Sequence, residues 1–328
     1  MKVVITGGAG FLGLLLAQRL VERGTLTGAS GAPEPIDEIV LFDVVAPPSL
    51  PASLKGRAEM VTGDIADAAG LRKLVSGDSV SVFHLASVVS AGAEQDFDLA
   101  LKVNLHGGIA LFEACRALPN KARMVFTSSV AAFGVDSVTQ AVADDTKVTP
   151  KTTYGMTKVI LELLCNDYTR KGFLDGRGAR PSTVIVRPGK PNKAASGFAS
   201  GVFREPLAGV PFALPVGPDI RMAIVGYRSV VDGLIRLHEV PSEALGHDRT
   251  INLPNLSVTV AEMVESLKRV AGNRKLGEVS YAPDPAIEAI CRGWPGHVGA
   301  TRAKSLGLQG DADLDSIVRG YIEDFVDR

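Results

Sequence analysis

Four glycines fall within the seven residues GGAGFLG near the start of this chain, directly after the β-branched stretch VVIT (residues 3–6). That stretch is typical of a strand, and residues 11–23 carry apolar side chains at helical spacing. Gly7, Gly10 and Gly13 therefore fit the pattern GxxGxxG between a strand and a helix. The first glycine turns the chain, the second lets a pyrophosphate approach the backbone, and the third lets the helix pack closely on the sheet. The pattern predicts a dinucleotide-binding turn, with the phosphates at the helix N-terminus.

The alternation of strand and helix continues through residue 189. Apolar runs and helical spacing predict strands at 38–43, 58–63, 79–86, 122–129 and 182–189, and helices at 94–117 and 153–170. Continuous apolar strands are typical of a parallel sheet that is covered on both faces. We therefore predict an α/β protein with a Rossmann-type, doubly wound parallel sheet.

The pattern changes at the end of the last of these strands. Residues 190–225 are rich in Gly, Pro and Ala and have no clear period, and helical patterns return at 229–240 and 261–272. We expect residues 1–189 to form the dinucleotide-binding domain that carries the catalytic residues. Residues 190–328 are expected to form a smaller substrate-binding lobe, with one strand or helix returning to the large domain.

Composition excludes several other classes of protein. With 35 basic and 36 acidic residues the net charge is −1, so no overall field would attract nucleic acid or an anionic membrane. No apolar run is long enough to span a membrane. The three cysteines lack CxxC spacing, which predicts buried thiols and no metal site, and His84 is predicted to be a core histidine. We expect a cytoplasmic protein.

Two acidic residues follow predicted strands. Asp43 ends the strand at 38–43, where a carboxylate accepts hydrogen bonds from both ribose hydroxyls and repels a 2′-phosphate, which favours NAD over NADP. Asp64 follows the strand at 58–63. It is predicted either to accept a hydrogen bond from the adenine amino group or to cap the next helix.

A tyrosine and a lysine share one face of the helix predicted at 153–170. Tyr154 and Lys158 are four residues apart, and Ser128 and Ser129 end the strand at 122–129. The pKa of a free tyrosine is too high for a base at neutral pH, but a nearby ammonium, joined by an oxidised nicotinamide, favours the phenolate. The pattern predicts a general base for hydride-transfer chemistry.

Together these motifs resemble the extended short-chain dehydrogenases/reductases, the NAD-dependent epimerase/dehydratase family. The resemblance rests on GGAGFLG, Asp43, GDI (63–65), HLAS (84–87), KVNLHGG (102–108), FTSSVAAFG (126–134), YGMTK (154–158) and RPG (187–189). It implies NAD contacts at Gly7, Gly10, Phe11, Leu12, Gly13, Asp43, Asp64, Ile65, Leu85, Ala86, Asn104, Tyr154, Lys158 and Pro188. It also implies a homodimer that is formed through the helices at 94–117 and 153–170.

The same resemblance assigns catalysis to Ser129, Tyr154 and Lys158. Ser129 would polarise the substrate hydroxyl, because the second serine of FTSSVAAFG aligns with the family's serine; Ser128 remains an alternative. Asn104 would steady the active-site helix.

Departures from the family pattern point to the substrate. Val130 and Ala131 stand where dehydratases of the family carry an Asp-Glu pair, and the sugar-nucleotide motif after RPG is replaced by KPNKAASGFASG. These departures favour a small acid as the substrate. RPGKPNKAASGFASG, followed by REPLAG, also resembles members of this family that oxidise four-carbon hydroxy acids, which implies NAD-dependent oxidation of a four-carbon aldonic acid at its C2 hydroxyl, giving the 2-keto acid and NADH. Ser87, Ser129, Tyr154, Lys190 and Asn192 are the predicted substrate-binding residues, with Lys190 on the carboxylate.

Other interpretations remain open. The alternative to a carboxylate-binding role for Lys190 is that of a solvated loop lysine. Two alternatives concern the whole chain. It could be a nucleotide-sugar 4-epimerase that keeps its NAD tightly bound, or a protein that senses NAD without catalysis.

Overall fold

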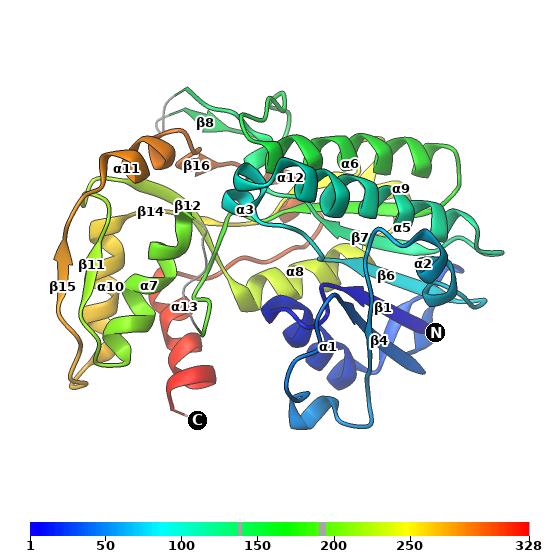
Figure 1. Ribbon diagram of the computed structural model, residues 1–328, viewed down its shortest axis with the longest axis horizontal. Coiled ribbons are helices and arrows are strands. Elements are labelled where there is room, and N and C mark those ends of the chain that lie inside the picture. The colour runs from blue at the N-terminus through cyan, green and yellow to red at the C-terminus, as the bar shows by residue number, and fades with distance from the viewer. Residues whose placement is uncertain (137–139, 190–194, 328) are drawn as a thin grey trace.

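The computed structural model describes residues 1–136, 140–189 and 195–327. Figure 1 shows a large part built on a seven-stranded sheet, with a smaller part beside it. The strands of the large sheet are β1 (Lys2–Thr6), β4 (Glu38–Asp43), β5 (Glu59–Thr62), β6 (Val80–His84), β7 (Arg123–Thr127), β9 (Asp175–Arg180) and β13 (Thr250–Asn252). Their order is β13-β9-β7-β6-β1-β4-β5, and all neighbouring pairs are parallel. The predicted doubly wound sheet is confirmed, and its strand order reverses between β1 and β6, where such sheets bind ligands.

Helices cover both faces of this sheet (Figure 1). Helices α1 (Phe11–Arg23) and α8 (Tyr227–Glu239) pack on one face, and α2 (Ala68–Leu74), α5 (Gly107–Arg116) and α6 (Thr153–Arg170) pack on the other. Successive residues of β1 point to opposite faces. Val3 and Ile5 accordingly join the core with α1 and α8, whereas Val4 joins the core with α2, α5 and α6.

The long helix predicted at 94–117 is interrupted. It consists of α3 (Ser90–Gln95), α4 (Phe97–Ala100), a π-helical turn (Leu101–His106) and α5. Asp96 breaks the first helix, because its backbone is extended and its side chain accepts a hydrogen bond from the Leu99 amide at the start of the next. The wider π-helical turn contains the buried Asn104.

The strand predicted at 182–189 does not belong to the large sheet. Only its first part is a strand, β10 (Thr183–Ile185), which joins β12 (Arg221–Gly226) and β14 (Leu256–Thr259) in a three-stranded sheet. The place next to β7 is taken by β9, whose sequence DGRGAR has no apolar pattern. Hydrophobic periodicity misses this strand because its buried side chains include two arginines.

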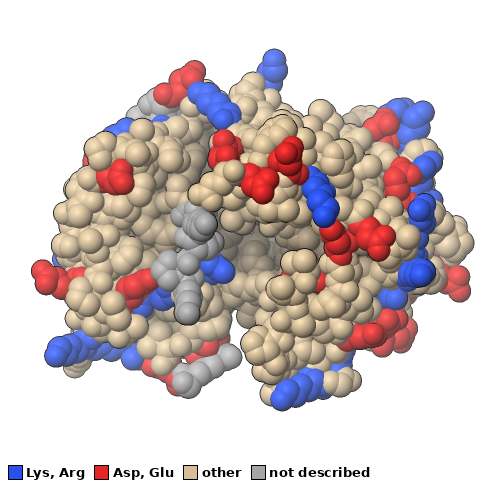
Figure 2. Space-filling view, in the orientation of Figure 1, with Lys and Arg blue, Asp and Glu red and all other residues tan. Residues whose placement is uncertain are grey.

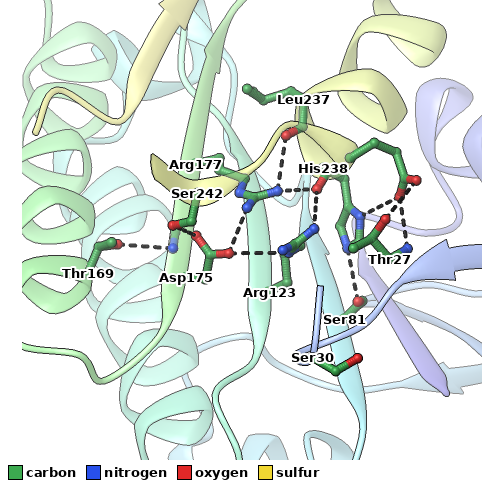
Figure 3. Close-up of polar contacts among 12 residues, drawn as sticks. Thr27, Ser30, Ser81, Arg123, Thr169, Asp175, Arg177, Leu237, His238 and Ser242 are labelled. Carbon is green, nitrogen blue, oxygen red and sulfur yellow. Dashed lines mark hydrogen bonds and ion pairs between the residues drawn. The ribbon is translucent and has the colours of Figure 1, made fainter. Parts of the chain in front are cut away.

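A cluster of paired charges explains how those polar residues fit into the interior (Figure 3). Asp175 accepts hydrogen bonds from Arg177 and Arg249, each at 2.6 Å, and forms an ion pair with Arg123 at 3.2 Å. Arg123 and Arg177 also donate to the carbonyl of His238, near the end of α8. The partial negative charge of this helix terminus helps to balance the extra guanidinium groups. We call these four charged residues the arginine cluster.

The smaller part has its own core. Beside the three-stranded sheet it contains α7 (Phe198–Leu207), α10 (Val260–Ala271), α11 (Pro285–Arg292), α13 (Leu314–Tyr321) and the pair β11 (Phe212–Leu214) and β15 (Val279–Tyr281). A second pair, β8 (Ala141–Val142) and β16 (His297–Val298), lies outside both sheets. Across the described ranges, no helix is long and apolar enough to cross a membrane.

Candidate active site

The backbone of the glycine turn packs closely at the carboxyl end of β1. Gly7 has a φ of 71°, and a Cβ there would lie 2.7 Å from the Ala86 amide nitrogen. A Cβ at Gly13 would lie 2.3 Å from the Gly7 carbonyl oxygen. Gly10 is the N-cap of α1 and has no side chain to cap it. It therefore accepts no side-chain hydrogen bond from the first amides of the helix, which begin with those of Phe11 and Leu12. An uncapped N-terminus next to such close backbone approach suits a pyrophosphate.

Asp43 lies beside this turn. Its carboxylate accepts hydrogen bonds from the amides of Ala9 at 3.1 Å and Val44 at 2.8 Å. No cation is paired with it among the described residues, so lone pairs remain for a ribose.

Asp64 lies at the end of the neighbouring strand, and the structure excludes one of its two predicted roles. Asp67, not Asp64, caps α2, by accepting a hydrogen bond from the Ala69 amide. Asp64 instead accepts from the Ala66 amide at 2.9 Å and forms an ion pair with Lys102 at 2.6 Å. These partners lower the pKa of its carboxyl. Its contact with adenine stays a prediction.

The loop after β6 is held by buried polar groups. The Leu85 amide donates to the Thr6 carbonyl at 2.9 Å. Asn104 accepts from the Val88 amide at 2.7 Å and donates to its carbonyl at 3.0 Å. Ser87 also donates to Asn104, at 3.1 Å. The described bonds of Asn104 thus fix the loop after β6, and the buried Ile65 borders the same region through its contact with Gly107.

Tyr154 and Lys158 lie in the first two turns of α6, as predicted. Thr152 caps this helix by accepting a hydrogen bond from the Gly155 amide at 3.0 Å. The Lys158 ammonium is 5.4 Å from the centre of the Tyr154 ring and donates to the Thr127 carbonyl at 2.8 Å. A Cβ at Gly155 would lie 2.1 Å from the Ala131 carbonyl, so only glycine lets the helix start this close to the turn after β7.

The structure separates the two serines. The Ser129 hydroxyl lies close enough to Tyr154 to lower the pKa of its phenol, and it accepts a hydrogen bond from the Ala131 amide at 3.1 Å. The Ser128 hydroxyl is buried and donates to Glu162, on the side of α6 that faces β9. This arrangement supports Ser129 as the serine that acts with Tyr154.

Burial controls the protonation of these groups. It raises the pKa of Tyr154 to about 12, against an opposing effect of the bond with Ser129. It lowers the pKa of Lys158 to about 8, against the attraction of Glu162. It also lowers the pKa of His84 to about 3, so this histidine is neutral. The predicted lowering of the tyrosine pKa is therefore absent from the chain alone, and a phenolate at neutral pH needs a further positive charge.

The two small-lobe residues predicted to bind substrate, Lys190 and Asn192, lie outside the described residues. Pro188 lies just before them and after Arg187. The Arg187 amide donates to Ser200 at 3.0 Å, and its carbonyl accepts from Arg204 at 2.8 Å. Figure 2 shows a hollow between the two parts of the molecule, with acidic groups along its upper edge in this view.

Sequence reasoning missed two features of this region. Glu162 is the third residue, after Tyr154 and Lys158, on one face of α6, and it pairs with Arg180 of β9. The spacing i, i+4, i+8 was a usable signal for Glu162. Nothing local to Arg180 indicates its partner.

Residues 3–251 match the family described as the NAD dependent epimerase/dehydratase family. The chain belongs to this family. NAD is therefore its cofactor, and the glycine turn with Asp43 beside it fits this dinucleotide.

Two relatives of this chain are described as D-erythronate dehydrogenases. That of Cupriavidus necator is 48% identical over 324 residues, which cover 99% of this chain and 98% of the relative. That of Haemophilus influenzae is 38% identical over 323 residues, covering 98% of this chain and 99% of the relative. A solved structure described as a nucleoside-diphosphate-sugar epimerase from Agrobacterium tumefaciens has a TM-score of 0.91 at 39% identity, covering 100% of this chain and 95% of that one.

Proposed function

We propose that this family member is an NAD-dependent dehydrogenase that oxidises D-erythronate, or a closely similar four-carbon aldonic acid, at C2 to the 2-keto acid and NADH. The observation that carries the proposal is the full-length similarity to two D-erythronate dehydrogenases. The geometry supports it, because Ser129, Tyr154 and Lys158 lie together at the carboxyl end of β7, and only β6 separates this strand from β1 and its glycine turn.

The three residues have different roles. Ser129 donates a hydrogen bond to the C2 hydroxyl oxygen and orients it. Tyr154, as the phenolate, accepts the proton of that hydroxyl at its Oη. Lys158 contributes a positive charge that stabilises the phenolate and a donor for the nicotinamide ribose. Oxidised NAD, when bound, accepts the hydride from C2 and adds a second positive charge near Tyr154.

The cofactor is held along the switch between β1 and β6. We propose that the pyrophosphate lies on the turn at Gly7, Gly10 and Gly13, and the adenosine ribose on Asp43. The remaining proposed contacts are Phe11, Leu12, Asp64, Ile65, Leu85, Ala86, Asn104, Tyr154, Lys158 and Pro188.

The C1 carboxylate needs a cation within reach of the C2 hydroxyl. Lys190, Asn192 and Ser87 are proposed for this site. Arg187 is a second candidate, because its half-buried guanidinium has no side-chain partner within the described residues and its backbone is held on both sides. Arg204 and Arg221 are less suitable, since Arg204 pairs with Glu205 at 2.6 Å and Arg221 bonds to the Ser257 carbonyl at 3.2 Å.

NADH formation with a panel of four-carbon acids tests the proposal. D-erythronate should be oxidised, and a neutral polyol of equal length should react poorly. Substituting methionine at the residue that binds the carboxylate, Lys190 or Arg187, should lower kcat/KM for the acid by about 10- to 150-fold and leave the polyol rate nearly unchanged. If both variants behave like the wild type, the carboxylate site is wrong and the reaction class stands.

A 4-epimerase is the second candidate, favoured by the description of the Agrobacterium tumefaciens structure. An epimerase returns the hydride, so it would interconvert UDP-sugars, retain NAD through purification and release no NADH. Epimerisation without oxidation of any acid would overturn the dehydrogenase proposal. Binding of NAD without either activity would indicate a sensor.

The organisation of the molecule completes the proposal. We propose a cytoplasmic homodimer, with residues 1–189 as the NAD-binding domain and residues 190–328 as the substrate-binding lobe. Strand β13 and helix α8 follow residue 190 in the chain and pack with the large sheet, which supports the expected return. Sedimentation velocity measures the oligomeric state directly.

A further inference from the structure

We propose that Glu162 is a positioning residue for catalysis: its buried carboxylate fixes the serine turn and lies one helical turn from Lys158, on whose ammonium it acts, and Arg180 limits the strength of this effect. The inference rests on the proposed chemistry of Tyr154 and Lys158. It does not depend on which acid is oxidised.

Glu162 lies one helical turn beyond Lys158 on the same face of α6, and its side chain is only 5% exposed. One carboxylate oxygen accepts hydrogen bonds from the Ser128 hydroxyl and from Arg180 Nε at 2.8 Å. The other accepts from Arg180 Nη2 at 2.5 Å. Arg180 lies over the Phe133 ring, 5.1 Å from its centre, so both charges are held in the interior.

The surroundings of Lys158 contain no other source of negative charge among the described residues. Its ammonium donates to the Thr127 carbonyl of β7, which is neutral. His84 on β6 is neutral because burial lowers its pKa to about 3, and burial keeps Tyr154 on α6 protonated in the absence of NAD. Glu162 is the one carboxylate that raises the pKa of Lys158, against the larger effect of burial. Glu162 therefore opposes the effect of burial on this ammonium.

The same carboxylate holds the backbone on which Ser129 sits. The Ser128 hydroxyl bonds to Glu162, and the Ser128 amide donates to the Ala179 carbonyl of β9 at 2.7 Å. Ser128 therefore cannot turn toward the substrate without breaking a buried charge-assisted bond. Glu162 thus acts on Lys158 and, through Ser128, on the turn that carries Ser129.

A purely structural ion pair would behave differently. Removing either partner of such a pair leaves an unpaired buried charge, so both changes would damage the protein in the same way. If Glu162 sets the charge state of Lys158, the two changes have opposite signs. Loss of the carboxylate makes the ammonium easier to deprotonate, and loss of the guanidinium makes it harder.

The experiment compares Glu162→Gln, Arg180→Gln and Ser128→Ala with the wild type. The pH dependence of acetic anhydride labelling of Lys158, read by mass spectrometry on cofactor-free protein, gives the midpoint of its titration without any turnover. The alkaline limb of kcat/KM for acid oxidation gives the same quantity during catalysis. Thermal unfolding at each pH selects the folded variants.

Glu162→Gln should lower the labelling midpoint by about one pH unit or more, and Arg180→Gln should raise it. Ser128→Ala keeps both charges and should leave the midpoint in place. If only one charge variant folds, the sign of its shift still decides the question. Unchanged midpoints, or shifts of the same sign, would overturn the inference. If the two labelling midpoints shift in opposite directions but the wild type oxidises no acid, the inference about Glu162 stands and the proposed function is refuted.

Discussion

Two buried groups of charged and polar residues lie in different parts of the large domain. The arginine cluster, Arg123, Arg177 and Arg249 around Asp175, lies where β7 and β9 begin. Tyr154, Lys158 and His84 lie where β6 and β7 end. In the first group, every guanidinium contacts a carboxylate, and two also bond to the end of a helix. In the second group, the direct partner of the ammonium among the described residues is a neutral carbonyl.

The difference separates residues that stabilise the fold from residues that take part in the reaction. Paired buried charges hold β9 in place although its sequence lacks an apolar pattern. Burial raises the pKa of Tyr154 to about 12 and lowers that of Lys158 to about 8, and groups with such shifted pKa values are concentrated at functional sites. Substitutions in the two groups should therefore change different measured quantities.

The largest effect is expected at Tyr154. Tyr154→Phe removes the proton acceptor and should reduce kcat by about 10²- to 10⁴-fold, because general base catalysis contributes a factor of that size. NAD affinity by calorimetry and the thermal midpoint should be nearly unchanged. High residual turnover would show that another residue is the base, and a large loss of stability would remove the distinction between the two groups.

Asp175→Asn should lower stability and leave turnover nearly unchanged, the reverse of Tyr154→Phe. It leaves three buried guanidinium groups without their carboxylate, so the free energy of unfolding in urea should fall by about 3–5 kcal/mol. The kcat of the remaining folded enzyme should be close to that of the wild type. Asp167→Asn is the matched control, since Asp167 forms an exposed ion pair with Arg170 and should change stability by about 0.5 kcal/mol or less.

Asp43→Ala sharpens the comparison at a carboxylate that pairs with no cation among the described residues. Its loss removes the proposed ribose acceptor and the repulsion of a 2′-phosphate, so the preference for NAD over NADP should narrow by about 10- to 100-fold, mainly through weaker use of NAD. Steady-state kcat/KM values with both cofactors measure this ratio. Equal use of NAD and NADP by the wild type would refute the assignment of Asp43.

The smallest effect is expected on stability at Lys158. Its pKa is about 8 in the folded protein and 10.5 as the reference value, so between these pH values the unfolded chain binds a proton that the folded chain does not, and stability rises with pH. Below pH 8 the folded protein holds a buried charge. Lys158→Met should therefore raise the free energy of unfolding at neutral pH by about 1–2 kcal/mol while it abolishes turnover. A destabilised variant would mean that the bond to Thr127 outweighs the cost of burial.

Much of this molecule follows from local sequence patterns. The glycine turn, the strand that ends at Asp43, α1 and α6 have the bounds that apolar spacing and capping residues predict, because each depends on residues within a few turns of one another. The i, i+4 relation of Tyr154 and Lys158 is a property of one helix. The prediction of the fold class and of a dinucleotide turn required nothing further.

Other features depended on partners far away in the chain. Strand β9 is buried because Arg177 reaches the end of α8 and Arg180 reaches Glu162, which are contacts that a hydrophobic pattern does not contain. Ser128 and Ser129 are adjacent in sequence, and only the position of α6 beside their turn assigns one to Glu162 and the other to Tyr154. The pKa values of Tyr154 and Lys158 likewise follow from burial by other elements. The sequence by itself determined which groups are present and how neighbours are spaced, whereas the tertiary structure decided which of them lose water and which find a charge.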